Sequence, residues 1–511
     1  HRLILHSQRY SKFTVIIIAH LPIMSDKKAS IPIGDKNNSS SSTQLVGNSS
    51  TSESSLEEAA TISSSPPILS TPYPLEDKSA IFKKMYAHSI GYSIQAANMD
   101  SVKLRTSAAR LQRTIVSLGF TKVDESMADC IVPEESKLNW ALLTSKGTDP
   151  PSGPSYMIMK PFVSRMYSMC SKWQLVQSLR IADQRMQQHH QSFLTGSGNL
   201  FSPQEFIPNT INLNSPNLEN DLASQPGVYL AKPARGSMGE HMQLVRIRSN
   251  RVQEDLLSFL LSSEFTHMHR SQVILQQYIE RPLLIDKRKF DMRVYMLVVN
   301  PKRGSGTGDR PKQSGYFAFH HPGFIRLCSE PYDPEHADIA VHLTNQSIQA
   351  KKVDTFRRLK EVTTWYPDEL NDYLNKRRRT NCKDWAKDVL YPKVGAILGY
   401  IAAVYRTHMD DRNCRTSTFR ILGVDLLVDE KLRLYLLEFN ELPAWGLQTS
   451  VLVSIKPNLW LEAISLVSEV AVRYKAYLPI DDEHLVTRQN FRLAYTSEDV
   501  NFARRNIAAL Y

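Results

Sequence analysis

The stretch GVDLLVDEKLRLYLLEFNELPAW, residues 423–445, determines more about fold and chemistry than any other part of the chain. Two apolar runs, 422–428 and 434–439, flank a charged turn at 429–431, and this pattern predicts a β-hairpin. Asp425 interrupts the first run, whereas Glu438 and Asn440 interrupt the second. Residues two apart on a strand share a face, so folding about 431–432 brings Asp425 beside Glu438, with Asn440 on the same side as Glu438.

This hairpin carries a candidate metal site. Two carboxylates and an amide oxygen on an otherwise apolar surface are costly to bury unless a cation binds them. Hard oxygen ligands with room for phosphate oxygens and water suit Mg²⁺. We therefore predict a magnesium site formed by Asp425, Glu438 and Asn440. The alternative from the same residues is a hairpin edge with ordinary polar side chains.

Composition limits the class of protein. The 511 residues include 62 Lys and Arg against 51 Asp and Glu, a net charge of +11 that fits an acidic partner. The basic residues are dispersed and no recognition motif is present, so no nucleic-acid partner is expected. Five scattered cysteines without metal-ligand spacing indicate reduced thiols in the cytosol. The apolar run within 13–23 is too short to span a bilayer, so no membrane partner is expected.

Composition also divides the chain along its length. Residues 1–78 are rich in Ser, Thr, Pro and Asn and predict a disordered low-complexity leader. Within it, 1–23 could be untranslated or non-native, because a typical polar start follows at Met24. From residue 81 mixed strand and helix signals predict an α+β protein, with a helix over 172–185 and an exposed loop over 209–226.

The segment VYLAKPARGSMGEHMQLV, residues 228–245, predicts a strand, a glycine-containing loop and a second strand. Lys232 at the end of the first strand, followed by Gly236 and Gly239, suits a cover over a polyphosphate. Backbone amides of such a loop approach the phosphates while the lysine supplies charge. No Walker sequence is present, and an ordinary hairpin is the alternative interpretation.

A stronger signal lies in VILQQYIERPLLIDKRKFDMRVYMLVV, residues 273–299. Lys289, Asp291 and Arg293 alternate with apolar residues, so three charges share one face of a predicted strand. Such a face indicates a lined cleft, and an ion-paired sheet edge is the alternative. The preceding residues 276–279 are the predicted hinge against which a purine ring would lie.

Two shorter segments complete the pattern. HLTNQSIQ, residues 342–349, places Thr344 and Asn345 where a helix N-cap or turn is expected. FIRLCSEPY, residues 324–332, holds Arg326 between apolar residues, which is typical of a strand arginine that faces a carboxylate.

In this order and spacing, the segments resemble the tubulin-tyrosine ligase-like family of ATP-grasp ligases over residues 81–477, most strongly from Phe206. The resemblance implies an α+β ATP-grasp fold. A small N-terminal α/β domain would occupy 79–205, and ATP would lie between a central domain at 206–300 and a C-terminal domain at 301–480. Residues 481–511 would form a C-terminal tail.

The resemblance also implies roles for individual residues. Asp425, Glu438 and Asn440 would hold Mg²⁺, Arg326 would bind the carboxylate of a free amino acid, and Arg293, Arg326 and Glu438 would be catalytic. ATP would be bound by Lys232, Gly236, Gly239, Gln276, Gln277, Tyr278, Ile279, Lys289, Phe290, Asp291, Thr344 and Asn345.

The reaction implied by the family is phosphorylation of a carboxylate on the acidic tubulin tail by ATP, followed by attack of a free amino acid. A cytoplasmic monomer acting on microtubules, the cytoskeleton and a cilium or basal body is expected. Lys456, sixteen residues after Asn440, and the RVYMLV sequence resemble the glutamate-adding members, in which the matching lysine helps hold glutamate, and so favour glutamate as the amino acid. A solvated lysine that opens the helix after Pro457 is the alternative interpretation of Lys456. The SEPY and HLTN segments are similar to tubulin-tyrosine ligase itself, and glycine is the third alternative.

Some positions depart from the family pattern. Met238 stands where the nucleotide loop usually has a basic residue, and His241 stands where it has glycine. Residues 302–315, rich in Gly, Lys and Arg, are predicted to be an insertion. A catalytically weak microtubule-binding relative therefore stays an alternative.

Overall fold

The computed structural model describes residues 167–188 and 200–497, except 237–240, 263, 303–314, 351–357, 378–379, 381, 410–416, 442 and 445–446. It also describes strands at 14–16, 90–93, 120–122, 130–131, 157–159 and 193–194. Helices and antiparallel sheets are mixed in this part of the chain, which confirms the α+β prediction.

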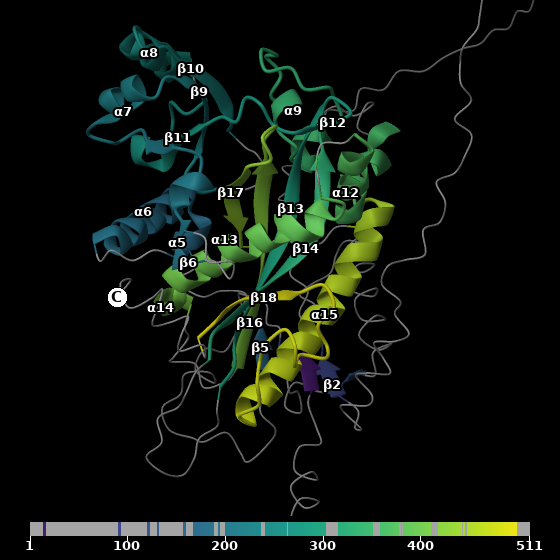
Figure 1. Cartoon of the computed structure of the whole chain (residues 1–511). Helices are drawn as coiled ribbons and strands as arrows, with labels where there is room; N and C mark the ends of the chain where they lie inside the picture. The colour runs from purple at the N-terminus through teal and green to yellow at the C-terminus, as the bar shows by residue number, and fades with distance from the viewer. Residues whose placement is uncertain are drawn as a thin grey trace, which may run out of the picture. The chain divides into compact units, whose positions relative to one another are not determined.

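Three long strands form the centre of the largest sheet (Figure 1). β13 (Arg288–Asn300) lies between β14 (Phe317–Leu327) and β16 (Ser417–Val428) and runs antiparallel to both. Shorter antiparallel strands extend them: β12 (Leu284–Ile285), β15 (Thr364–Trp365), β17 (Leu434–Asn440) and β18 (Arg492–Thr496). Beyond β16 the sheet continues through parallel strands: β5 (Met157–Met159), β4 (Cys130–Ile131), β1 (Thr14–Ile16), β2 (Ile90–Ser93) and β3 (Phe120–Lys122).

Both faces of the sheet are buried along its three long strands, β13, β14 and β16. Alternate residues of β13 point to opposite faces, so Met292, Val294 and Met296 join one hydrophobic cluster while Tyr295 and Leu297 join another. Helices α6 (Lys172–Gln188) and α13 (Tyr391–Val404) contribute to the first cluster, and α15 (Ser450–Lys475) contributes to the second. By length and composition α15 is apolar enough to cross a membrane, but it packs on this sheet.

A separate four-stranded antiparallel sheet has the order β10 (Gln243–Ile247), β9 (Gly227–Pro233), β11 (Val273–Gln277) and β8 (Thr210–Asn212). Helices α7 (Leu218–Ser224) and α8 (Val252–Ser262) cover it with their own hydrophobic cluster. β6 (Phe193–Leu194) pairs with β7 (Leu200–Phe201). The remaining α-helices described are α5 (Tyr167–Cys170), α9 (Ile339–His342), α10 (Gln346–Gln349), α12 (Pro367–Lys376) and α14 (Arg406–Met409).

The structure departs from the predicted organisation in three places near the sheets. Residues 209–226 are not one exposed loop, because β8 and α7 bury Ile211, Leu218 and Leu222 in the small core. The boundary predicted at residue 300 is too late, because β13 already belongs to the large sheet. Within the predicted leader, Thr14–Ile16 forms a strand beside β2, since its β-branched residues suit a sheet.

The C-terminal segment after α15 is part of the fold rather than the tail predicted for 481–511. β18 pairs with β14, and Phe491 and Tyr495 are buried. The buried Glu462 of α15 accepts hydrogen bonds from the backbone amides of Gln489 (2.5 Å), Asn490 (2.6 Å) and Phe491 (2.8 Å). Residues 498–511 lie outside the described part of the chain.

Glu462 should therefore contribute to stability through its charge. Glu462→Gln keeps the volume and one acceptor, but hydrogen bonds to a neutral group are weaker than those to a carboxylate. We expect the free energy of unfolding to fall by about 2 kcal/mol, measured by urea denaturation. Glu483→Gln, at an exposed position of the same segment, is the control and should unfold like the wild type. If both variants have the same midpoint of urea denaturation, Glu462 does not hold the C-terminal segment in place through its charge.

Candidate active site

The predicted hairpin is confirmed. β16 and β17 pair with Asp425 opposite Glu438, and Leu432 in the turn adopts a φ of +62°. The Asn440 amide nitrogen lies 3.3 Å from both Asp425 Oδ2 and Glu438 Oε1. The three side chains proposed as metal ligands therefore meet at one point on the sheet.

Two arginines compensate the buried Asp425. In the register of the strands Arg293 faces Asp425, and Asp291 faces Arg326. Arg293 donates to both oxygens of Asp425 (2.5 and 3.0 Å), and Arg326 contacts Asp291 (2.7 Å) and Asp425 (3.1 Å). Burial opposes ionisation, but these arginines still hold the pKa of Asp425 well below its ordinary range. Positive and negative side chains thus alternate across β14, β13 and β16, and Arg326 faces a carboxylate, as predicted.

Lys172 belongs to the same cluster and was not predicted from the sequence. It opens α6, is buried, and places its ammonium 3.0 Å from Glu438 Oε2 and 3.0 Å from the carbonyl oxygen of Gly236. Burial raises the pKa of Glu438, but Lys172 and Lys232 reverse this, so that the net shift is downward. The sequence signal was only a lysine among apolar residues at a helix start.

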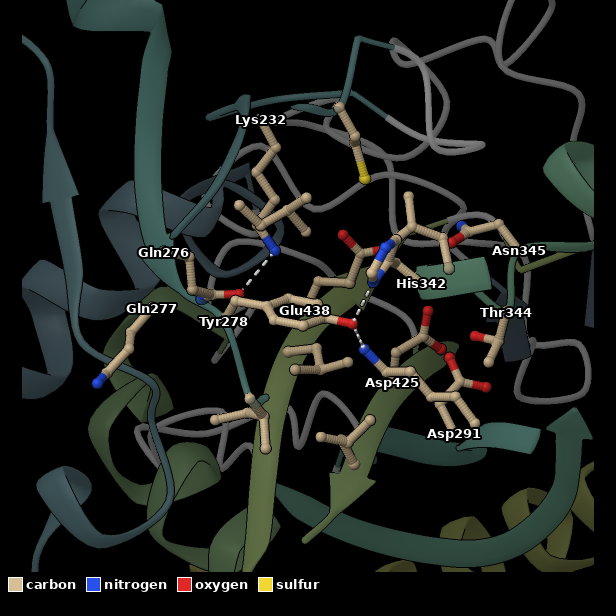
Figure 2. A pocket seen from close by; sticks show the side chains of 17 residues that line it. Lys232, Gln276, Gln277, Tyr278, Asp291, His342, Thr344, Asn345, Asp425 and Glu438 are labelled. Carbon is tan, nitrogen blue, oxygen red and sulfur yellow. Dashed lines mark hydrogen bonds between the residues drawn. The ribbon is translucent and has the colours of Figure 1, made fainter. Parts of the chain in front are cut away.

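A pocket lies beside these charges (Figure 2). Lys232 and Lys289 line it, and both are buried. Their ammonium groups donate to neutral acceptors, Gln276 Oε1 (2.8 Å) and Tyr278 OH (2.8 Å), and neither forms an ion pair with a described residue. Burial lowers the pKa of each lysine to about 8. A bound anion would compensate both charges, so the pocket suits a polyphosphate.

Most of the predicted nucleotide residues line this pocket: Lys232, Gln276, Gln277, Tyr278, Ile279, Lys289, Asp291, Thr344 and Asn345. Phe290 does not, and its assignment was wrong, because alternation along β13 turns it into the hydrophobic core. Gly236 contributes its carbonyl to Lys172 but does not line the pocket, and Gly239 lies outside the described residues. Lining residues that sequence reasoning missed include Leu230, Met242, His342, Leu427 and Leu437.

Lys456 is buried in α15, with its ammonium 5.5 Å from the ring centre of Phe324. The alternative of a solvated lysine that opens a helix was therefore wrong. Burial, and then the positive charges of Arg293 and Arg326, lower the pKa of Lys456 to about 7. This places a third cation near the two arginines that surround Asp425.

Comparison with known proteins shows which family the chain resembles. A sequence model of the Tubulin-tyrosine ligase family matches residues 163–475. The chain belongs to this family. Inactive polyglycylase TTLL10 from Homo sapiens is 27% identical over 310 residues, which cover 58% of this chain and 43% of that protein. Protein polyglycylase TTLL10 from Mus musculus is 28% identical over 311 residues, 58% of this chain and 41% of that protein.

The name of a third relative specifies glutamylation instead of glycylation. Tubulin polyglutamylase TTLL7 from Homo sapiens is 27% identical over 259 residues, covering 47% of this chain and 25% of that protein. The chain thus spans less than half the length of these curated relatives. The family match confirms the resemblance found in the sequence and includes every residue predicted for the site.

Ligases of the tubulin-tyrosine ligase family use ATP, generally with Mg²⁺. The residues present here fit both. Two buried lysines without ion-pair partners among the described residues fit phosphates, and the oxygens of Asp425 and Glu438 fit a hard cation. The amide of Asn440 would turn its oxygen toward that cation, since the orientation of an amide follows its partners.

Proposed function

We propose that this chain is an ATP-dependent ligase that joins a free amino acid to a carboxylate of tubulin. The observation that supports it is the pocket in which the ammonium groups of Lys232 and Lys289 have neutral hydrogen-bond partners, beside the paired carboxylates Asp425 and Glu438. ATP, a substrate here, would lie between the four-stranded sheet and the large sheet, because residues of both line the pocket. This would be the ATP-grasp arrangement. A tubulin substrate implies a place in the cytoplasm at the microtubule cytoskeleton.

The chain's own residues would bind ATP and neutralise its charge. Lys232 and Lys289 would contact phosphate oxygens, and the backbone of 276–279 would border the base. Mg²⁺, held by Asp425, Glu438 and Asn440, would neutralise charge on the phosphates and orient the transferred group. Fixed charges of this kind act without reorganisation during the reaction.

The acceptor carboxylate would attack the γ-phosphorus, so that an acyl phosphate forms and ADP leaves. The amine nitrogen of the amino acid would then attack the acyl carbon, phosphate would depart, and the amine would lose its extra proton to solvent or phosphate. Positioning and charge neutralisation suffice for both steps. Arg293 and Arg326, which pair with Asp425 and do not themselves line the pocket, would hold the amino-acid carboxylate and the developing negative charge.

Glutamate is the amino acid that we favour. Lys456 is buried near Arg293 and Arg326. These arginines would bind the α-carboxylate of the amino acid, and Lys456 would bind the side-chain carboxylate of glutamate. Glycine is the second candidate, because the names of several relatives, among them tubulin glycylase 3A of Drosophila melanogaster, specify glycylation. A weakly active protein is the third, since Met238 and His241 alter the nucleotide loop and one relative is named inactive.

Replacing Lys456 separates these candidates. Lys456→Met keeps an unbranched side chain of similar length but removes the charge. We expect the KM for glutamate to rise about tenfold or more, because a buried carboxylate without its cation is poorly tolerated. The KM for glycine or tyrosine should not change. The assay is incorporation of each labelled amino acid into tubulin with ATP, and Lys475→Met, at the last residue of the same helix, is the control.

The pH dependence provides a second check on the same residue. Because the pKa of Lys456 is lowered to about 7, its charged form is lost as the pH rises through 7. The value of kcat/KM for glutamate should therefore fall above about pH 7 in the wild type, and this fall should be absent in Lys456→Met.

Glycine incorporation without any glutamate incorporation would overturn the preferred specificity and leave the ligase assignment standing.

A further inference from the structure

Each of the two pocket lysines begins a chain of buried hydrogen bonds that leads to a backbone carbonyl. In the first, Lys232 donates to Gln276 Oε1 (2.8 Å), Gln276 Nε2 donates to Thr210 Oγ1 (3.1 Å), and Thr210 donates to the carbonyl of Pro208 (2.8 Å). Thr210 is fully buried and does not line the pocket.

The second chain of hydrogen bonds is formed by residues from other parts of the fold but has the same arrangement. Lys289 donates to Tyr278 OH (2.8 Å), Tyr278 OH lies 2.9 Å from His342 Nδ1, and His342 Nε2 lies 2.7 Å from the carbonyl oxygen of His336. His342 is fully buried, and its ring packs edge-on against those of Tyr278 and Tyr332.

Each chain has a fixed direction because it ends on a backbone carbonyl, which can only accept. The Thr210 hydroxyl gives its single proton to Pro208, so it must accept from Gln276, and the amide oxygen of Gln276 must then face Lys232. Likewise the His342 ring carries its proton on Nε2, so Nδ1 accepts the Tyr278 hydroxyl, whose oxygen is left to accept from Lys289. Both lysines therefore meet an acceptor without negative charge.

We propose that Thr210 and His342 are positioning residues that orient Gln276 and Tyr278, and through them the two lysines that hold the phosphates of ATP. This inference rests on the proposed function. Neutral partners fix each ammonium group in place while leaving its charge for the ligand, whereas a carboxylate partner would compete with phosphate. Without Thr210 the amide of Gln276 is free to turn its NH₂ group toward Lys232, where two donors repel each other.

The test compares variants that keep or remove the essential acceptor. Thr210→Val removes the hydroxyl at nearly constant volume, and Thr210→Ser restores it. His342→Gln keeps a polar group near the Nε2 position, and His342→Asn keeps one near Nδ1, where Tyr278 needs an acceptor. Thr363→Val is the matched control, because the buried Thr363 also donates to a backbone carbonyl, that of Lys360 (2.8 Å), away from the pocket.

Calorimetric titration with ATP and Mg²⁺, together with the melting temperature of the ligand-free protein, gives the readout. We expect Thr210→Val and His342→Gln to weaken ATP binding on the order of tenfold, the usual effect of losing one hydrogen-bond partner. Thr210→Ser and Thr363→Val should bind within about threefold of the wild type. Because His342 also lines the pocket, His342→Asn is compared with His342→Gln and should bind ATP more tightly than that variant. If Thr210→Val melts lower than the wild type, Thr210→Ala replaces it in the same comparison.

The possible failures are distinguishable. Wild-type affinity in Thr210→Val or His342→Gln would overturn this inference alone, as would an equal loss in Thr363→Val, which would indicate a general effect of lost packing. Failure of the serine and asparagine variants to restore binding would also overturn it. Absence of ATP binding by the wild type would overturn the proposed function, and this inference with it.

Discussion

Glu438→Gln is expected to reduce ligation on the order of 10²–10³-fold, the usual effect of removing one preorganised electrostatic group from an active site. The substitution keeps the shape of the side chain but removes a charge that would help hold Mg²⁺. It also leaves the ammonium of Lys172, now 3.0 Å from the carboxylate, without its ion-pair partner. Ligation is measured as incorporation of labelled amino acid into tubulin, with ATP and Mg²⁺ present.

The control for this prediction lies in the same hairpin. Glu430 pairs with Arg281 at the turn and does not line the nucleotide pocket, so Glu430→Gln should retain activity. The melting temperature of both variants separates loss of chemistry from loss of fold. If a folded Glu438→Gln variant keeps near-normal activity, the hairpin is not part of the active site.

The hairpin and the charged strand face could be predicted because their signals are local. Alternation along a strand and a polar turn are properties of consecutive residues, so the side-by-side placement of Asp425 and Glu438 followed from the sequence alone. The same alternation predicted the face that carries Lys289 and Asp291. Phe290 was placed wrongly only because a resemblance assigned a whole segment, although alternation already excluded it.

Residues that enter the site from distant elements could not be predicted in this way. Lys172 meets Glu438 only because α6 packs on the sheet, and no local pattern encodes that contact. The alternative interpretation of Lys456, a solvated lysine that opens a helix at Pro457, does not hold. The helix begins at Ser450, where the side chain of Thr449 accepts a hydrogen bond from the amide of Leu452. Lys456 therefore lies within the helix.

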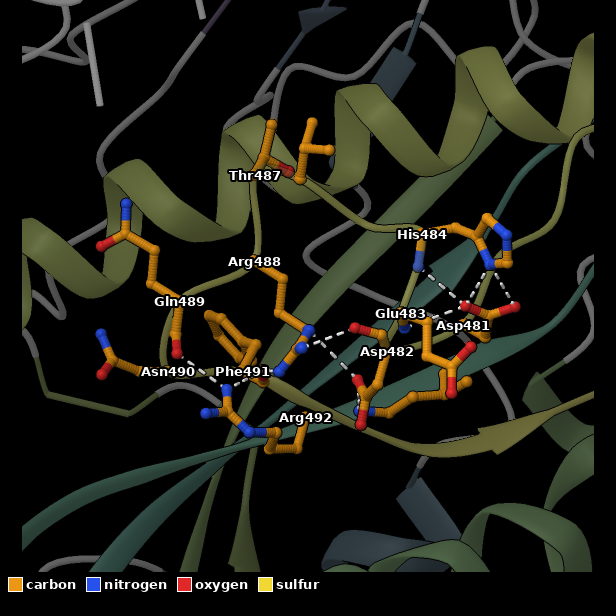
Figure 3. Close-up of polar contacts among 12 residues, drawn as sticks. Asp481, Asp482, Glu483, His484, Thr487, Arg488, Gln489, Asn490, Phe491 and Arg492 are labelled. Atoms are coloured by element: carbon orange, nitrogen blue, oxygen red, sulfur yellow. Dashed lines mark hydrogen bonds and ion pairs between the residues drawn. The ribbon is translucent and has the colours of Figure 1, made fainter. Parts of the chain in front are cut away.

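The C-terminal segment was misjudged for a related reason. Its polar composition is typical of a tail, and Figure 3 shows many of these side chains in contact with one another, including His484 with Asp481 (2.7 Å) and Arg488 with Asp482 (3.3 Å). Its backbone amides are satisfied by Glu462 and Glu469 of α15. Because these amides are hydrogen-bonded, few apolar residues are needed to hold the segment in place. Partners so far apart in the chain cannot be recognised from the sequence.

Arg326→Ala is expected to have the largest effect on stability. Arg326 is buried and is shared by Asp291 and Asp425, so alanine leaves two buried carboxylates partly uncompensated. Breaking a buried ion pair from one side typically costs about 3–5 kcal/mol, and the free energy of unfolding should fall by that amount in urea denaturation. Loss of ligation by this variant would not, by itself, identify a substrate contact.

Arg326→Lys separates the two roles. Lysine keeps the positive charge between the carboxylates, so most of the stability should remain, but it lacks the planar fork that binds a carboxylate with two parallel hydrogen bonds. We expect the KM for the amino acid to rise about tenfold or more for whichever amino acid is the substrate, with the affinity for ATP unchanged. An unchanged KM in a folded Arg326→Lys would mean that the amino-acid carboxylate binds elsewhere. An Arg326→Ala variant as stable as the wild type would mean that the alternating charges do not hold β13, β14 and β16 together.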